Sequence, residues 1–169
     1  MSMIEETKSA PKRHRRRSTK KPKRTVYFVL PIEEWDWGYS FGINDWKLRP
    51  DEAYLDHRHL RIVGSLDRPS AMQGRRTKVS FVPDDLPQDI HRYRSKPERV
   101  GTMWLNRKEM TMEGVLSMPI DALPNLIPML LAGRLKYLVI DGFDFYRGNA
   151  SVRNYRFSAT LDPDDLPPE

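Results

Sequence analysis

The sequence predicts an all-β, mainly antiparallel fold: a β-sandwich or barrel-like sheet with one short helix and a disordered basic N-terminal tail. Three observations indicate this fold. Several short stretches alternate apolar and polar side chains with the two-residue period of a strand. One stretch has clear helical spacing, and the first 24 residues combine ten Lys and Arg side chains with no aromatic one.

Residues 1–24, which we call the leader, carry most of the net charge. Ten of the 29 Lys and Arg residues and two of the 23 Asp and Glu residues lie there, which gives the leader +8 and leaves 19 against 21, or −2, for the rest. Like charges repel, and no neighbouring apolar side chains offset the entropy of ordering the leader. We therefore divide the chain into a disordered basic tail, 1–24, and a single β-rich domain, 25–169.

The clearest strand covers residues 35–43. Its odd positions are large and apolar, and its even positions are Asp, Gly or Ser. Side chains of a strand alternate between its two faces, so one face would carry five apolar residues: Trp35, Trp37, Tyr39, Phe41 and Ile43. This pattern favours a core strand. The alternative is an exposed platform on which sugars or bases stack.

The other elements are expected in order along the chain. Further strands are predicted at 25–30, 57–66, 77–81, 100–105, 110–118, 135–145 and 155–161, with connections at 44–54 and 83–98. Apolar residues at helical spacing predict one helix over 120–131, capped by Gly133 and interrupted at Pro128.

Composition excludes several classes of function. The chain has no cysteine, which excludes disulfides, thiolate metal sites and cysteine nucleophiles. No apolar run approaches the roughly 20 residues of a membrane helix, and the N-terminus lacks the apolar core of a secretory signal. We expect a cytoplasmic protein, or a nuclear one if the source is eukaryotic, without a cofactor or a membrane partner.

The leader is the strongest functional signal. Its cations would release counterions from RNA or DNA and bind it without reading its sequence. The predicted contacts are Lys12, Arg13, Arg15, Arg16, Arg17, Lys20, Lys21, Lys23 and Arg24. If the strands at 57–66 and 77–81 pair, Arg61, Arg76 and Lys78 would form a basic patch that extends this contact.

Two enzyme readings stay open beside this one. His57 and His59 share one strand face and are weak candidates for a metal-dependent hydrolase, although a metal site needs a third ligand. Glu33, Glu34 and Asp36 could act as an acid–base pair or bind magnesium.

Because no catalytic residue or phosphate loop can be named, we expect a non-enzymatic binding or assembly protein. Its leader would contact nucleic acid, and its β domain would contact a protein partner or a second copy of the chain. A small-ligand or sugar-binding module is the remaining alternative.

Overall fold

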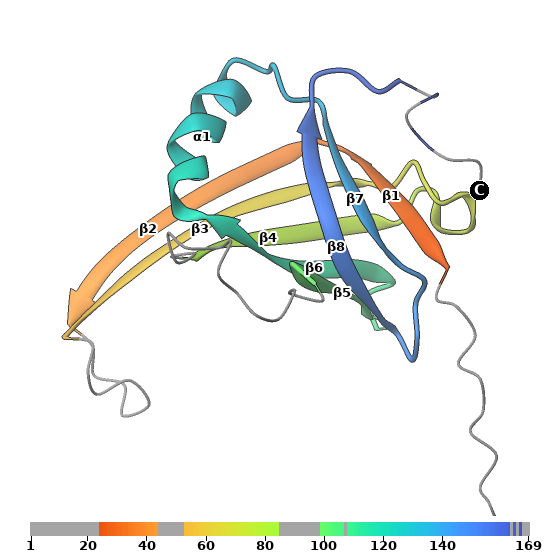
Figure 1. Ribbon diagram of the computed structural model, residues 1–169, viewed down its shortest axis with the longest axis horizontal. Helices are drawn as coiled ribbons and strands as arrows, with labels where there is room; N and C mark the ends of the chain where they lie inside the picture. The colour runs from red at the N-terminus through yellow and green to blue at the C-terminus, as the bar shows by residue number, and fades with distance from the viewer. Residues whose placement is uncertain are drawn as a thin grey trace, which may run out of the picture.

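The computed structural model describes residues 24–43, 53–84, 99–106, 108–162, 164 and 166, and it confirms the all-β fold (Figure 1). Eight strands form one largely antiparallel sheet, and one short helix, α1 (Leu123–Leu131), packs on it. The strands are β1 (Thr25–Pro31), β2 (Glu34–Ile43), β3 (Tyr54–Ser65), β4 (Arg76–Asp84), β5 (Gly101–Asn106), β6 (Thr111–Pro119), β7 (Tyr137–Phe143) and β8 (Asn149–Ser158).

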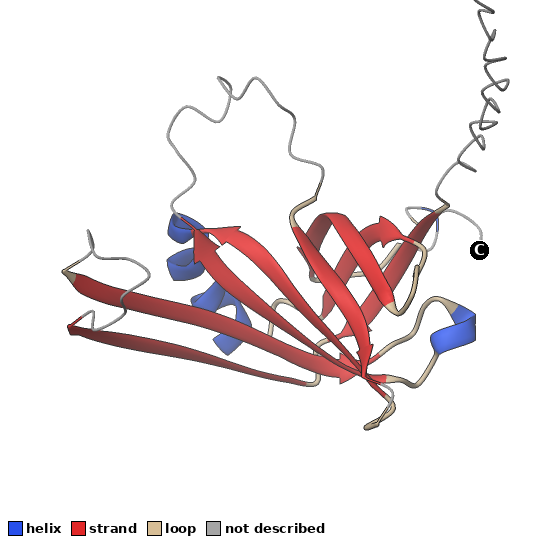
Figure 2. Ribbon diagram, turned by 90° about the horizontal axis from the view of Figure 1, so that it is seen from below, coloured by secondary structure: helices blue, strands red, loops and turns tan. Residues whose placement is uncertain are grey.

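The strand order is β1-β7-β8-β5-β6-β4-β3-β2. Every neighbouring pair is antiparallel except β4 and β6, which are parallel. Two residues join β1 to β2, yet these two strands lie at opposite ends of the order. The sheet curves so that β1, β7 and β8 cross the direction of β2, β3 and β4 (Figures 1 and 2). Beside this crossing, the backbone of Val29 in β1 hydrogen-bonds with Asp67 and Arg68, which follow β3.

The core lies on the concave side of this sheet. Phe28, Leu60 and Phe81 come from three different strands and have no exposed surface. The predicted helix is confirmed, but it begins at Leu123 and runs through Pro128 without the expected interruption. It buries Leu123 and Leu130 against the same core. It contains Pro128, and Gly133 follows it with φ +61°, the left-handed conformation that favours glycine at a helix end. The free energy gained by burying the leucines offsets the cost of the backbone hydrogen bond that the proline removes.

Strand β7 differs from its prediction. It covers Tyr137–Phe143 where 135–145 was expected, and Leu138 and Ile140 face the main core. Val139 is buried on the opposite face in a second, smaller cluster with Leu166 from the C-terminal segment. The strand is therefore apolar on both faces, and alternation does not distinguish them.

The start of β8 also differs from its prediction. It begins at Asn149 instead of 155. Arg147 and Gly148 form a tight turn with φ values of +53° and +84°, and Tyr146 and Asn149 exchange both backbone hydrogen bonds across it.

The crossing of β1 over β3 depends on Gly64. A Cβ atom at this position would collide with the carbonyl oxygen of Pro31, whereas a Cβ atom at Gly42 would meet nothing within 4 Å. We expect Gly64→Ala to lower the free energy of unfolding by about 1–3 kcal/mol, the usual cost of overpacking, and Gly42→Ala to leave it nearly unchanged. Urea denaturation of both variants measures the difference. Equal stability of the two would contradict the close approach of the strands.

Candidate interaction surfaces

The leader joins the domain at the start of β1. Residues 1–23 lie outside the described residues, so their predicted contacts with nucleic acid stay predictions. Arg24 is exposed, and its carbonyl oxygen accepts a hydrogen bond of 3.0 Å from the backbone N–H of Asp144, which follows β7. The point at which the leader leaves the domain is thus fixed at the β1 edge of the sheet.

Arg61, Arg76 and Lys78 do lie on one surface, as predicted. Strands β3 and β4 pair with Arg61 opposite Ser80, Val63 opposite Lys78 and Ser65 opposite Arg76. All of these side chains point away from the core, because their neighbours Ile62, Thr77 and Val79 are buried.

Carboxylates also lie on this surface and pair with two of the three cations, so a contact with nucleic acid here stays a prediction. Arg76 forms ion pairs with Glu33 and, at 2.6 Å, with Glu34, and Arg61 lies 3.3 Å from Asp36. Hydrogen bonds from Ser65, followed by the guanidinium of Arg76, lower the pKa of the Glu33 carboxyl group. Glu33 precedes β2, and Glu34 and Asp36 belong to it. These three carboxylates are the ones considered as an acid–base pair or magnesium ligands, and each of them contacts an arginine.

His57 and His59 are neighbours on the same outer face, with ring centroids 5.6 Å apart. The Nε2 atom of His59 lies 3.9 Å from a carboxylate oxygen of Asp36. Among the residues that the structure describes, no group of three or more His, Cys, Asp or Glu side chains could hold a metal ion. The arrangement of the described residues therefore gives the two histidines no third ligand.

The aromatic row of β2 is the largest departure from the prediction. Trp35 packs against the core, but the rest of the row is exposed: Trp37 by 51 %, Tyr39 by 56 %, Phe41 by 62 % and Ile43 by 75 %. Tyr54 of β3, on the same face, is exposed by 60 %. The expectation that this row forms a core strand is wrong beyond Trp35. We call Trp37, Tyr39, Phe41, Ile43 and Tyr54 the aromatic face.

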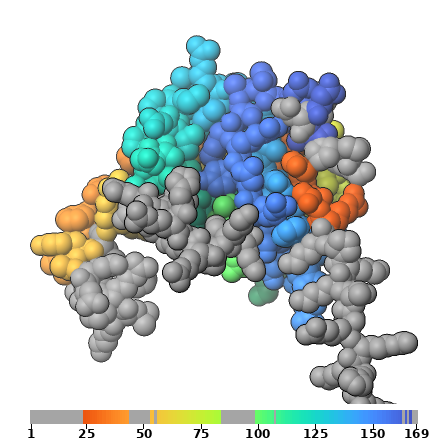
Figure 3. Space-filling model, viewed as in Figure 1, coloured from red at the N-terminus to blue at the C-terminus, as the bar shows by residue number. Residues whose placement is uncertain are grey.

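The exposed residues lie where β3 separates from β4, because β4 continues to Asp84 beside β6 and no longer beside β3. Strand β4 pairs with β3 only over residues 60–65 of β3, whereas β2 pairs with β3 along its whole length, from Glu34 to Ile43. From Trp37, which lies opposite Leu60, the two strands continue as a two-stranded extension, residues 37–43 and 54–59, which we call the arm. The arm projects from the body of the domain in Figures 1 and 2, and its orange and yellow side chains stand out in Figure 3.

The aromatic face has its own internal contacts. Phe41 and Tyr54 stack with their ring centroids 5.3 Å apart and an interplanar angle of 17°. The guanidinium of Arg58 lies 5.5 Å from the ring centroid of Tyr39 and forms an ion pair of 2.6 Å with Asp56. Sequence analysis missed Tyr54 and Arg58 because no motif marks them. Only the register of β2 against β3 places them on this face.

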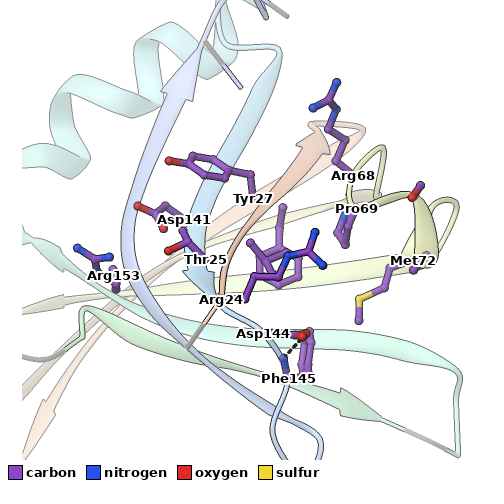
Figure 4. Close-up of a pocket in the computed structure, with 14 residues that line it drawn as sticks. Arg24, Thr25, Tyr27, Arg68, Pro69, Met72, Asp141, Asp144, Phe145 and Arg153 are labelled. Atoms are coloured by element: carbon purple, nitrogen blue, oxygen red, sulfur yellow. Dashed lines mark hydrogen bonds between the residues drawn. The ribbon is translucent and has the colours of Figure 1, made fainter. Parts of the chain in front are cut away.

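A cleft of about 920 Å³ lies at the other end of the domain (Figure 4). It is bordered by the start of β1, the loop from Arg68 to Met72 and the connection between β7 and β8. Arg24 and Arg68 lie on one side of it, and Asp141 and Arg153 on the other. Three arginines and two aspartates line the cleft, so its charge favours neither an anion nor a cation.

No protein-family model matches the chain, and no curated protein or solved structure matches it either. None of the described helices is long and apolar enough to cross a membrane.

The exposure of the aromatic face predicts a contrast between two residues that face each other across β2 and β3, Trp37 and Leu60. We expect Trp37→Ser to change the free energy of unfolding by about 1 kcal/mol or less, because half of the side chain is already in water. Leu60→Ala should cost about 2–5 kcal/mol, because Leu60 is fully buried. Chemical denaturation checks both values. A larger loss for Trp37→Ser would mean that the arm belongs to the core.

Proposed function

We propose that the chain is a non-enzymatic binding and assembly protein. Its leader contacts RNA or DNA without sequence preference, and the arm of its β domain contacts a protein partner. The observation that carries the proposal is the aromatic face, which gathers five large apolar side chains outside the core.

The aromatic face supports a protein partner. Single exposed apolar side chains are ordinary on a soluble protein, whereas a contiguous apolar patch marks an interaction site. Tryptophan, tyrosine and phenylalanine are enriched in protein interfaces, and charged residues are depleted in their centres. Arg58 and Asp56 lie on this face, opposite Tyr39 and Phe41, and neutralise each other.

Charge and position support the nucleic-acid contact of the leader. The leader carries +8, whereas residues 25–169 carry −2 and have their arginines on β3 and β4 paired with carboxylates. The leader joins β1 at one end of the domain, and the tip of the arm lies at the opposite end (Figure 1). The two surfaces can therefore be occupied at the same time, as an assembly protein requires.

A second candidate function follows from the exposed rings themselves. Trp37 and Tyr39 could stack on the bases of a single strand, because every base offers a flat π surface. If the rings stack on bases, binding of single-stranded nucleic acid should weaken when these two side chains are replaced.

The test is the anisotropy of a fluorescent oligonucleotide, single-stranded and duplex, measured with the full chain at increasing salt. The proposal expects binding of both forms, a steep loss with salt and no change on the double substitution Trp37→Ser and Tyr39→Ser. Selective loss of the single-stranded form in that variant would favour base stacking. Binding that salt does not weaken would exclude the leader as the contact.

A further inference from the structure

We propose that the protein partner of the arm is a second copy of this chain. The two copies would pair through β2, antiparallel, about a twofold axis that passes between the two Tyr39 residues. The inference rests on the proposed function, since it identifies the partner that the arm contacts.

The edge of β2 is open to such pairing. The sheet ends at β2, whose one strand neighbour among the described residues is β3. Residues 37–43 contain neither a charged residue nor a proline, the devices that usually protect an edge strand. At the other end of the sheet, β1 is already hydrogen-bonded to Asp67 and Arg68.

The sequence of β2 is complementary to itself. In an antiparallel pair, directly opposite residues lie on the same face of the sheet. With Tyr39 opposite its own copy, Trp37 faces Phe41 and Trp35 faces Ile43, so all five apolar residues of β2 gain an apolar partner. Cross-strand aromatic pairs stabilise a sheet, and the aromatic faces of the two arms would join into one surface.

Charge complementarity favours the same register. Asp36 falls opposite Gly42, and Gly38 falls opposite Ser40, so no like charges face each other. Glu34 lies beyond the paired segment. An interface of this kind uses one patch on both copies, as in most homodimers. An extended peptide of another protein would need to reproduce this pattern, which a second copy already carries.

The absence of cysteine from the chain allows a direct test with the full-length protein. Tyr39→Cys would place two thiols across the axis with Cα atoms about 4.5–5.5 Å apart, within the range of a disulfide. Ile43→Cys is the matched control on the same strand, because its copy would lie about 27 Å away along the strand. We expect mild oxidation to give a covalent dimer of Tyr39→Cys, seen on a non-reducing gel, and to leave Ile43→Cys uncrosslinked.

Light scattering of the uncrosslinked protein provides the second measurement. The unmodified chain should have the mass of a dimer. Tyr39→Lys, which sets two like charges against each other, should have the mass of a monomer. Tyr54→Lys changes the same face on β3 and should stay dimeric. Mixing Tyr39→Lys with Tyr39→Glu should restore a dimer.

Several results would overturn the inference: a monomeric unmodified chain, a dimer that Tyr39→Lys does not dissociate, or crosslinking of Ile43→Cys in place of Tyr39→Cys. If Tyr39→Lys fails to fold, as judged by circular dichroism, the two cysteine variants decide. Oligonucleotide binding separates this failure from that of the proposed function. If the unmodified chain is a monomer that still binds the oligonucleotide, only the dimer is overturned. If Tyr39→Lys no longer binds the oligonucleotide, the arm contacts nucleic acid, and the proposal that it contacts a protein is wrong.

Discussion

Deletion of residues 1–24 is expected to abolish retention of nucleic acid at low salt and to leave the melting temperature of the β domain nearly unchanged. The deletion removes ten of the 29 Lys and Arg residues and turns a net charge of +6 into −2. With 6–10 phosphate contacts, affinity for duplex DNA falls by about 10³–10⁵ between 50 and 200 mM salt. The full chain should therefore release nucleic acid over this salt range. Co-purified nucleic acid, measured by absorbance at rising salt, and a thermal melt of both proteins provide the two readouts.

Two leader variants serve as controls for this deletion. Replacing the nine cations between Lys12 and Arg24 by Gln should have the effect of the deletion, because the phosphate contacts depend on charge. A leader of the same composition in shuffled order should bind as the natural one does, because the predicted contact reads no sequence. If the deleted protein retains nucleic acid as before, the domain itself is the binding surface and the proposed role of the leader is wrong.

Phe81→Ala is expected to cause the largest loss of stability from a single substitution. Phe81 is fully buried, lies opposite Leu60 on β3, and contacts the rings of Tyr155 and Phe157 with centroids 5.0 and 5.2 Å away. Removing the ring leaves a cavity where strands far apart in the sequence meet. We expect the free energy of unfolding to fall by about 3–5 kcal/mol and the melting temperature by about 10 °C or more.

Phe41→Ala is the matched control for Phe81→Ala, because it removes the same ring from the exposed end of the arm. Its expected cost is about 1 kcal/mol or less, chiefly from the lost stacking on Tyr54. Differential scanning calorimetry of the two variants compares them under one condition. Similar losses at both positions would contradict the division between the core and the aromatic face.

Much of the secondary structure could be predicted from local patterns. Alternation located β2 and β4, and the spacing of leucines with Gly133 located α1. The strands expected at 100–105 and 110–118 correspond to β5 and β6, which pair as a hairpin across a short connection. These features depend on residues close together in the sequence, where periodicity and turn chemistry act.

The interaction surfaces were harder to predict, because they depend on pairings between distant segments. No local sequence pattern predicts the parallel pairing of β4 with β6. None predicts that carboxylates of β2 lie beside Arg61 and Arg76 either. The basic patch was expected because the positions of its cations are visible in the sequence, whereas the positions of their partners are not.

Composition and two-residue periodicity are properties of the chain alone, and they were enough to predict an all-β fold with the positive charge concentrated in the first 24 residues. The tertiary structure decided which apolar residues are buried. Alternation fixes which side chains share a face, whereas the segments that pack on that face fix whether water reaches them. Strand β4 pairs with β3 only from Leu60 onward. Along β2 the same pattern packs against the core at Trp35 and is exposed at Tyr39.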